Sequence, residues 1–165
     1  MVFELPADCD PRIRRFAAYL ASKAPSGLLP GRQHIVPNEI VDLLPFVAMY
    51  DVVRETDGNL RYRARLIGTH IVELYGHDPT GRCMDEYVPA LAVEKVVARF
   101  HQIVRTREPD YYADQLVKEG REHVRFQRAA FPLARNGEDV DMVAVIRIGL
   151  GAYGKVFREI DLLHR

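Results

Sequence analysis

The sequence predicts an α+β fold in which a five-stranded antiparallel sheet carries helices on one face and an extra helix at the N-terminus. Three patterns lead to this prediction. Apolar residues recur at helical spacing near the N-terminus, two strand patterns meet at a tight turn near residues 56–59, and an all-helical stretch separates that hairpin from three further strand patterns. Since single helices do not alternate with single strands, the order argues against a doubly wound parallel sheet.

The composition fits one globular domain with a core of its own. The 165 residues are 48% hydrophobic and 28% charged. The 23 Lys and Arg residues balance 23 Asp and Glu residues, which argues against a nucleic-acid binder and against a polybasic membrane surface. Two scattered cysteines, no signal-peptide pattern and no apolar run of membrane-spanning length lead us to expect a cytoplasmic protein.

The first predicted helix covers residues 10–24. Asp10 is a favourable N-cap, and Pro11 suits the first helical position. Residues 37–44 are predicted as a short second helix, which Pro45 closes. The apolar stripe of the first helix consists of Ile13, Phe16, Ala17, Leu20 and Ala24.

A β-hairpin is predicted next. Residues 46–55 are rich in Val, Met, Tyr and Phe, and apolar side chains alternate with arginines over residues 60–66. Asp57 and Gly58 lie between the two segments and supply the positive φ that a tight turn needs. The two segments should therefore pair as antiparallel strands.

The rest of the chain is predicted to be helical and then stranded. Short helical pieces over residues 68–89, broken by Gly76, Pro79 and Gly81, lead into a longer helix over residues 90–107. Three later strands are expected at 110–117, 124–132 and 141–150. Turns at 118–121 and 135–138 should connect them, and a short tail helix is expected at 155–163. The domain boundaries are an N-terminal helix at 1–26, the sheet domain at 27–150 and a tail at 151–165.

Several short motifs carry a family resemblance. They are Leu44-Pro45, Tyr50-Asp51-Val52, Tyr62-Arg63-Ala64-Arg65-Leu66-Ile67-Gly68-Thr69 and Tyr75-Gly76-His77-Asp78-Pro79-Thr80-Gly81-Arg82. With the element order, they resemble the PAS domain family, and in detail a bacterial, mostly alphaproteobacterial branch of stand-alone PAS-like proteins. The resemblance covers about residues 31–150 and places the first helix outside the family core. It implies a sensory or interaction role, exerted in trans, rather than a reaction.

The same motifs also have a structural interpretation. Gly68 ends a strand where the chain turns into a helix that Thr69 can cap. Asp78 can cap the next turn, and Gly81 permits a positive φ. We therefore expect these residues to serve the fold rather than chemistry.

Tyrosines and arginines supply the candidate ligand-binding residues. Arg61, Arg63 and Arg65 share one strand face, later strands carry further arginines, and guanidinium groups suit a carboxylate or phosphate. Alternatively, the arginines cover the outer sheet face and pair with Asp51, Asp110 and Asp114. The tyrosines line a pocket or form cross-strand pairs, and both interpretations stay open. The candidate set is Tyr50, Tyr62, Arg65, Tyr75, His101 and Arg128.

No metal and no cofactor are predicted. The six histidines lack the spacing of a metal site. Cys83 stands where flavin-binding PAS proteins carry a photoreactive cysteine, but Arg82 and Met84 beside it depart from their motif, so the flavin adduct is not carried over. His101 lies on the helix that holds the haem ligand in some PAS sensors. Haem and flavin stay open as alternatives.

We therefore expect a non-enzymatic sensory or signalling module. It binds an unknown small molecule or a signalling protein between the sheet and the helix at residues 90–107, and it forms a homodimer through the N-terminal helix. Two alternatives are a small isomerase-like enzyme on a cone-shaped α+β fold and a structural adaptor without a pocket.

Overall fold

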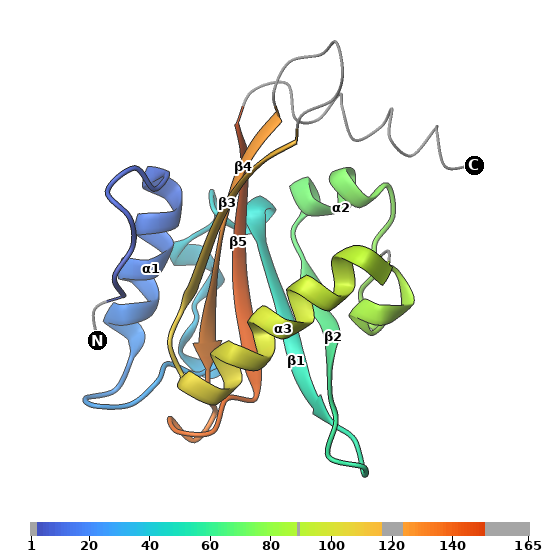
Figure 1. The fold of residues 1–165 in the computed structure, drawn as a ribbon. Helices are drawn as coiled ribbons and strands as arrows, with labels where there is room; N and C mark the ends of the chain where they lie inside the picture. The colour runs from blue at the N-terminus through green and yellow to red at the C-terminus, as the bar shows by residue number, and fades with distance from the viewer. Residues whose placement is uncertain (1–2, 89, 117–123, 151–165) are drawn as a thin grey trace.

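The computed structural model describes residues 3–88, 90–116 and 124–150 (Figure 1). Its helices are α1 (Pro11–Lys23), α2 (Thr69–Tyr75) and α3 (Ala90–Thr106). Its strands are β1 (Val47–Arg54), β2 (Leu60–Ile67), β3 (Asp110–Leu116), β4 (Val124–Leu133) and β5 (Met142–Leu150). Short 3-10 turns are η1 (Arg32–His34), η2 (Pro37–Glu39), η3 (Leu44–Phe46) and η4 (Met84–Glu86). The turn expected at 118–121 and the helix expected at 155–163 lie outside the described residues.

The strands form one sheet in the order β2-β1-β5-β4-β3, and each neighbouring pair is antiparallel. β1 lies between β2 and β5, so the first hairpin pairs with the last strand, with Val47 opposite Ile146. α2, η4 and α3 occupy the connection from β2 to β3. The predicted five-stranded antiparallel sheet and the all-helical connection are both confirmed.

Helices cover both faces of the sheet (Figure 1). α1 packs on one face, where Phe16 joins a buried cluster with Met49 of β1. α2 and α3 cover the opposite face, where Phe100 joins a second cluster with Tyr50 of β1. Successive side chains on a strand point to opposite faces, so neighbouring residues of β1 belong to different cores.

The extra N-terminal helix begins as predicted. The Asp10 carboxylate accepts a hydrogen bond from the backbone N–H of Arg12 at 2.8 Å and further bonds from the Arg12 guanidinium. The helix packs against β4 and β5 with a fully buried stripe of Ile13, Phe16 and Leu20. The apolar stripe therefore stabilises the contact with the sheet of its own chain.

The helix predicted at residues 37–44 is wrong. After η2, Ile40 leaves helical backbone at φ −134° and ψ 30°, and η3 forms only from Leu44 onward. Ile40 and Leu43 are both buried in the core under α1. A three-residue spacing of apolar side chains suits successive 3-10 turns as well as an α-helix, so the pattern alone could not distinguish them.

α3 is a 17-residue helix with one buried side. Phe100 and Ile103 are buried, and Val93, Val96 and Val97 pack partly buried against the same cluster. Among the described helices, none has both the length and the apolar character required to cross a membrane. α3 is therefore an amphipathic cover of the sheet.

Candidate functional site

The face of the sheet under α3 is the candidate site. Tyr50 on β1 and Tyr62 on β2 belong to the buried cluster beneath this helix. Arg128 on β4 points to the same side, because Ala130, two residues further along the strand, belongs to that cluster. Three residues of the predicted set therefore share one face.

Aromatic rings fill one part of this space. The ring centroid of Phe100 lies 5.4 Å from that of Tyr50 and 5.0 Å from that of Tyr62, and both contacts are edge-on. The Tyr62 hydroxyl is buried and has no hydrogen-bond partner among the described residues. Its burial raises the pKa of Tyr62 well above the ordinary value. This part of the site is thus a packed aromatic core with a neutral phenol.

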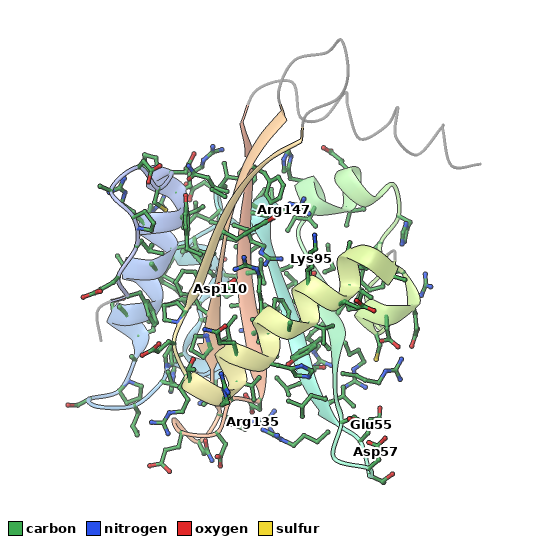
Figure 2. All side chains as sticks on the ribbon, in the orientation of Figure 1. Glu55, Asp57, Lys95, Asp110, Arg135 and Arg147 are labelled. Carbon is green, nitrogen blue, oxygen red and sulfur yellow. The ribbon has the colours of Figure 1, made fainter. Side chains whose placement is uncertain are left out.

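Arginines occupy the neighbouring part of the same face. Arg128 of β4 and Arg147 of β5 stand directly opposite each other as cross-strand partners. Arg99 approaches from α3, and its Nη1 donates to Oδ1 of Asp110 on β3 at 2.8 Å. The figure of all side chains shows Asp110 and Arg147 on the strands behind α3 (Figure 2). Helix and sheet thus meet at a polar cluster of three arginines and one aspartate.

Within this cluster, Arg128 is held by a long ion pair. Its Nη2 lies 3.8 Å from Oδ2 of Asp110, beyond hydrogen-bond distance. The Nε of Arg128 and Oδ2 of Asp110 are buried and have no hydrogen-bond partner among the described residues. Burial lowers the pKa of Arg128, and the charge of Arg147 lowers it further, while Asp110 opposes both effects. The buried charge of Arg128 is therefore only partly offset by Asp110, the carboxylate that acts on it among the described residues.

Two aromatic rings hold the guanidinium groups. Tyr112 of β3 lies under Arg99, 4.3 Å from guanidinium carbon to ring centroid, and 5.7 Å from Arg128. Phe126 of β4 lies 4.6 Å from the guanidinium of Arg147. Such stacking stabilises a planar cation and leaves its N–H edges directed sideways. The arginines are therefore oriented before any ligand binds.

The other predicted site residues lie elsewhere. Arg65 is exposed and is the unpaired residue at the irregularity between β1 and β2, so it does not belong to the buried cluster of Tyr62 and Ala64. His101 is exposed on α3, with its ring centroid 5.6 Å from that of Tyr62. Tyr75 ends α2, and its side chain lies outside the described part of the structure. The structure thus brings Tyr50, Tyr62 and Arg128 to one face, with His101 at its edge.

Two arginines of β2, Arg61 and Arg63, have carboxylate partners. Arg61 bonds to Asp85 at 2.8 Å and to Glu86 at 3.0 Å, and Arg63 bonds to Asp51 at 3.1 Å. The alternative in which these arginines pair with Asp51 is confirmed for Arg63, and the side chain of Asp114 lies outside the described residues. These exposed pairs neutralise much of the basic face of the strand, which leaves the cluster around Arg128 as the better site for an anion.

Arg99 is the member of the cluster that the sequence analysis missed. It lies off the apolar stripe of α3, and its partner Asp110 stands 11 residues later, at the start of β3. One signal was available: Lys95 and Arg99 are four residues apart, so they share a side of the helix and mark a basic strip beside the apolar one.

The two cysteines have the character of unreactive thiols. Cys9 and Cys83 are buried free thiols, and burial raises the pKa of each. No group of three His, Cys, Asp or Glu side chains suited to a metal ion occurs in the described ranges. A hollow of about 360 Å³ at the β4–β5 turn is lined by exposed charged side chains such as Arg135 (Figure 2), which is typical of a solvated turn.

Comparisons with known proteins agree with this architecture. A family model described as "PAS domain" matches residues 10–146. No curated protein matches the chain. Among solved structures, the PAS domain of Bordetella pertussis BvgS is 17% identical, with 77% of this chain and 94% of that chain covered and a TM-score of 0.50.

Two light-oxygen-voltage (LOV) structures show more distant similarity. The Rhodobacter sphaeroides LOV protein is 10% identical, with 92% of this chain and 76% of that chain covered and a TM-score of 0.45. The LOV domain of the blue-light activated histidine kinase EL346 from Erythrobacter litoralis is 17% identical, with 66% and 98% covered and a TM-score of 0.42. At these identities, the similarity to solved structures concerns the fold.

Proposed function

This chain belongs to the PAS domain family, and on that premise we propose that it is a non-enzymatic sensory module that binds a small molecule between the sheet and α3. The observation that carries the proposal is Arg128, whose side chain is only 12% exposed and whose Nε has no hydrogen-bond partner among the described residues. A buried guanidinium with unused donor capacity is costly unless a further acceptor reaches it. A bound ligand would supply that acceptor.

The same cluster offers a route from ligand to signal. Asp110 contacts both Arg99 of α3 and Arg128 of β4. A ligand that binds Arg128 would weaken the ion pair of Arg128 with Asp110 and so change the contact of Asp110 with Arg99. Because one partner is on the helix, the position of α3 over the sheet would respond to binding.

Purified protein tests the proposal directly. Native mass spectrometry and an absorption spectrum of the full chain should show a retained small molecule, and Arg128→Gln should lose it. Arg65→Gln is the matched control, because Arg65 is an exposed arginine of the same sheet outside the buried cluster. Equal retention by both variants would reject Arg128 as a ligand-binding residue.

A structural adaptor without a pocket is the second candidate. The edge-on packing of Phe100 against Tyr50 and Tyr62 favours it, because these rings occupy the space nearest the middle of α3. On this alternative, the purified chain retains no small molecule and none from a metabolite library binds. The enzyme alternative depended on a cone-shaped fold, and the PAS sheet order removes that basis.

We further propose that the signal passes to a protein partner in the cytoplasm and that the chain forms a homodimer through α1. The two free cysteines in the described residues support a reducing compartment. Since the apolar stripe of α1 is buried on its own sheet, a dimer would use the outer face of the helix, which includes Arg15 and Ala18. Light scattering of the full chain at a monomer mass of 18.9 kDa would reject the dimer.

A further inference from the structure

Building on the proposed function, we propose that the ligand is a small oxyanion, with a carboxylate or phosphate group that binds the guanidinium group of Arg128 in competition with Asp110. The proposal names a ligand class for the site and a protein group that the ligand displaces.

The first argument is charge. Arg128 and Arg147 are directly opposite on neighbouring strands, and like charges at such positions repel each other. Arg99 adds a third cation that acts on Arg128, and Asp110 is the one carboxylate among the charged groups that act on it in the described structure. An anion bound at Arg128 would offset the positive charge of this buried group.

The second argument is the geometry of the donors. A guanidinium presents five N–H groups in a planar fork that matches two oxygens on one centre. Asp110 uses one oxygen at 2.8 Å from Arg99, while its other oxygen stays 3.8 Å from Arg128. Arg128 therefore forms a long ion pair and retains an unused Nε donor. Carboxylate and phosphate groups both supply the pair of oxygens that this fork accepts.

The third argument is order and access. The rings of Tyr112 and Phe126 stack on the guanidinium groups and fix their planes. The side chains of Arg99 and Asp110 are 35% and 22% exposed, so the cluster reaches solvent on the side of α3. Because the Nε of Arg128 and Oδ2 of Asp110 are buried, an anion that enters from this side reaches Arg128 only by displacing the Asp110 carboxylate.

The experiment measures anion binding to the full-length chain. We would record thermal unfolding midpoints and ¹H–¹⁵N spectra during titration with sodium phosphate and, separately, sodium acetate, with sodium chloride at equal ionic strength as the reference. Wild type should show saturable shifts with at least one oxyanion and none with chloride. Binding of phosphate alone would assign a phosphate ligand, and binding of acetate would assign a carboxylate. Shifts no larger than those of chloride would overturn the proposal.

Three variants locate the anion. Arg128→Gln should weaken oxyanion binding about tenfold or more, as expected for the loss of charge-assisted hydrogen bonds, while Arg65→Gln should bind as wild type. Asp110→Asn removes the competing charge and should bind more tightly. Tighter binding cannot arise from a folding defect, so the result for Asp110→Asn still tests the proposal if Arg128→Gln folds poorly. Weaker binding by Asp110→Asn, or equal losses in both arginine variants, would contradict the proposal.

Failure here is distinguishable from failure of the proposed function. Suppose that wild type retains a neutral compound, that Arg128→Gln loses it, and that no oxyanion binds. This result would reject an oxyanion as the ligand and would leave the proposed sensory site in place.

Discussion

Gly68 lies so close to Pro45 that a Cβ atom on Gly68 would stand 2.4 Å from the Pro45 carbonyl oxygen and 2.3 Å from that of Leu44. The backbone N–H of Gly68 donates to the carbonyl of Val47 at 2.8 Å, so the end of β2 closes directly onto η3. Its φ of −64° and ψ of 150° are ordinary values, which means that glycine is needed for space and not for conformation. One contact therefore explains why Leu44-Pro45 and Gly68-Thr69 occur together.

Gly68→Ala should lower the free energy of unfolding by about 3 kcal/mol, because two backbone oxygens cannot move aside as a flexible side chain could. Gly58→Ala is the control. Gly58 has φ of +86° and open space around its α-carbon, so the added methyl group costs about 1 kcal/mol of backbone strain. Urea unfolding of both variants measures the difference. A loss for Gly68→Ala no larger than that for Gly58→Ala would contradict the close approach.

The second part of the family motif also serves the fold. The Asp78 carboxylate accepts hydrogen bonds from the backbone and hydroxyl of Thr80 at 3.0 and 2.7 Å. Gly81, at φ +90°, then lets the chain run along β2, where its N–H donates to the carbonyl of Ala64 at 2.7 Å. The loop thereby covers the outer edge of the sheet next to β2. The structural interpretation is confirmed for Asp78 and Gly81. The expected cap by Thr69 is wrong, because Gly68 is the N-cap of α2 and no side-chain hydrogen bond caps this helix.

Local signals were sufficient for most elements of the fold. The N-cap Asp10 and the Asp57-Gly58 turn depend on hydrogen bonds and φ values within a few residues, so the sequence predicts them well. The position of α1 does not depend on such local contacts. Its apolar stripe shows that one side of the helix is buried, but not which face of the sheet buries it. Phe16 meets Phe131, 115 residues later, at a centroid distance of 5.7 Å.

The candidate site was predicted in part for a similar reason. Alternation of side chains shows that Tyr50 and Val52 share a face of β1, but only the tertiary structure identifies that face as the one under α3. Arg128 was found from its residue type. The contact of Arg99 with Asp110 joins a helix to the next strand and follows neither a helical nor a strand period.

The buried Tyr62 hydroxyl gives a second prediction. Tyr62→Phe removes a hydroxyl without a hydrogen-bond partner among the described residues and should raise the free energy of unfolding by about 1 kcal/mol. Tyr19→Phe is the matched control. The Tyr19 hydroxyl accepts from the backbone N–H of Val36 at 2.7 Å and donates to its carbonyl at 3.2 Å, so this variant should lose about 1 kcal/mol. Urea unfolding should show opposite signs, and a loss in both variants would contradict the prediction.

Asp10 predicts a dependence of stability on pH. Its hydrogen bonds to Arg12 hold the pKa of Asp10 below its ordinary value in the folded chain. The contribution is therefore fully present above the unfolded pKa of about 3.9 and is lost as the pH falls through the lower, folded pKa. Asp10→Asn keeps a capping oxygen but not the charge, so its deficit against wild type, about 1 kcal/mol at pH 7, should shrink below pH 4.

Asp42→Asn is the comparison for that experiment. Asp42 pairs with Arg15 at the exposed surface, where solvent screens the charges, so the deficit of Asp42→Asn at pH 7 should be smaller than that of Asp10→Asn. Urea unfolding from pH 7 to pH 3 gives both curves as differences from wild type, which cancels the titration of the other carboxylates. A deficit of Asp10→Asn that is constant over this range would show that the charge contributes nothing.

The contact of Arg99 with Asp110 gives the last prediction, because it joins α3 to β3 and would carry a signal from the site. A double-mutant cycle with Arg99→Gln and Asp110→Asn should give a coupling energy of about 1 kcal/mol, as the pair is direct at 2.8 Å but only partly buried. Arg99→Gln should also increase hydrogen exchange in α3 more than in α1, which packs on the opposite face of the sheet. Arg82→Gln provides a control, since its pair with Glu86 is exposed and 3.8 Å long. Additive effects in the cycle, or equal exchange in α3 for both arginine variants, would mean that the helix is held by its apolar contacts alone and that another group must transmit the signal.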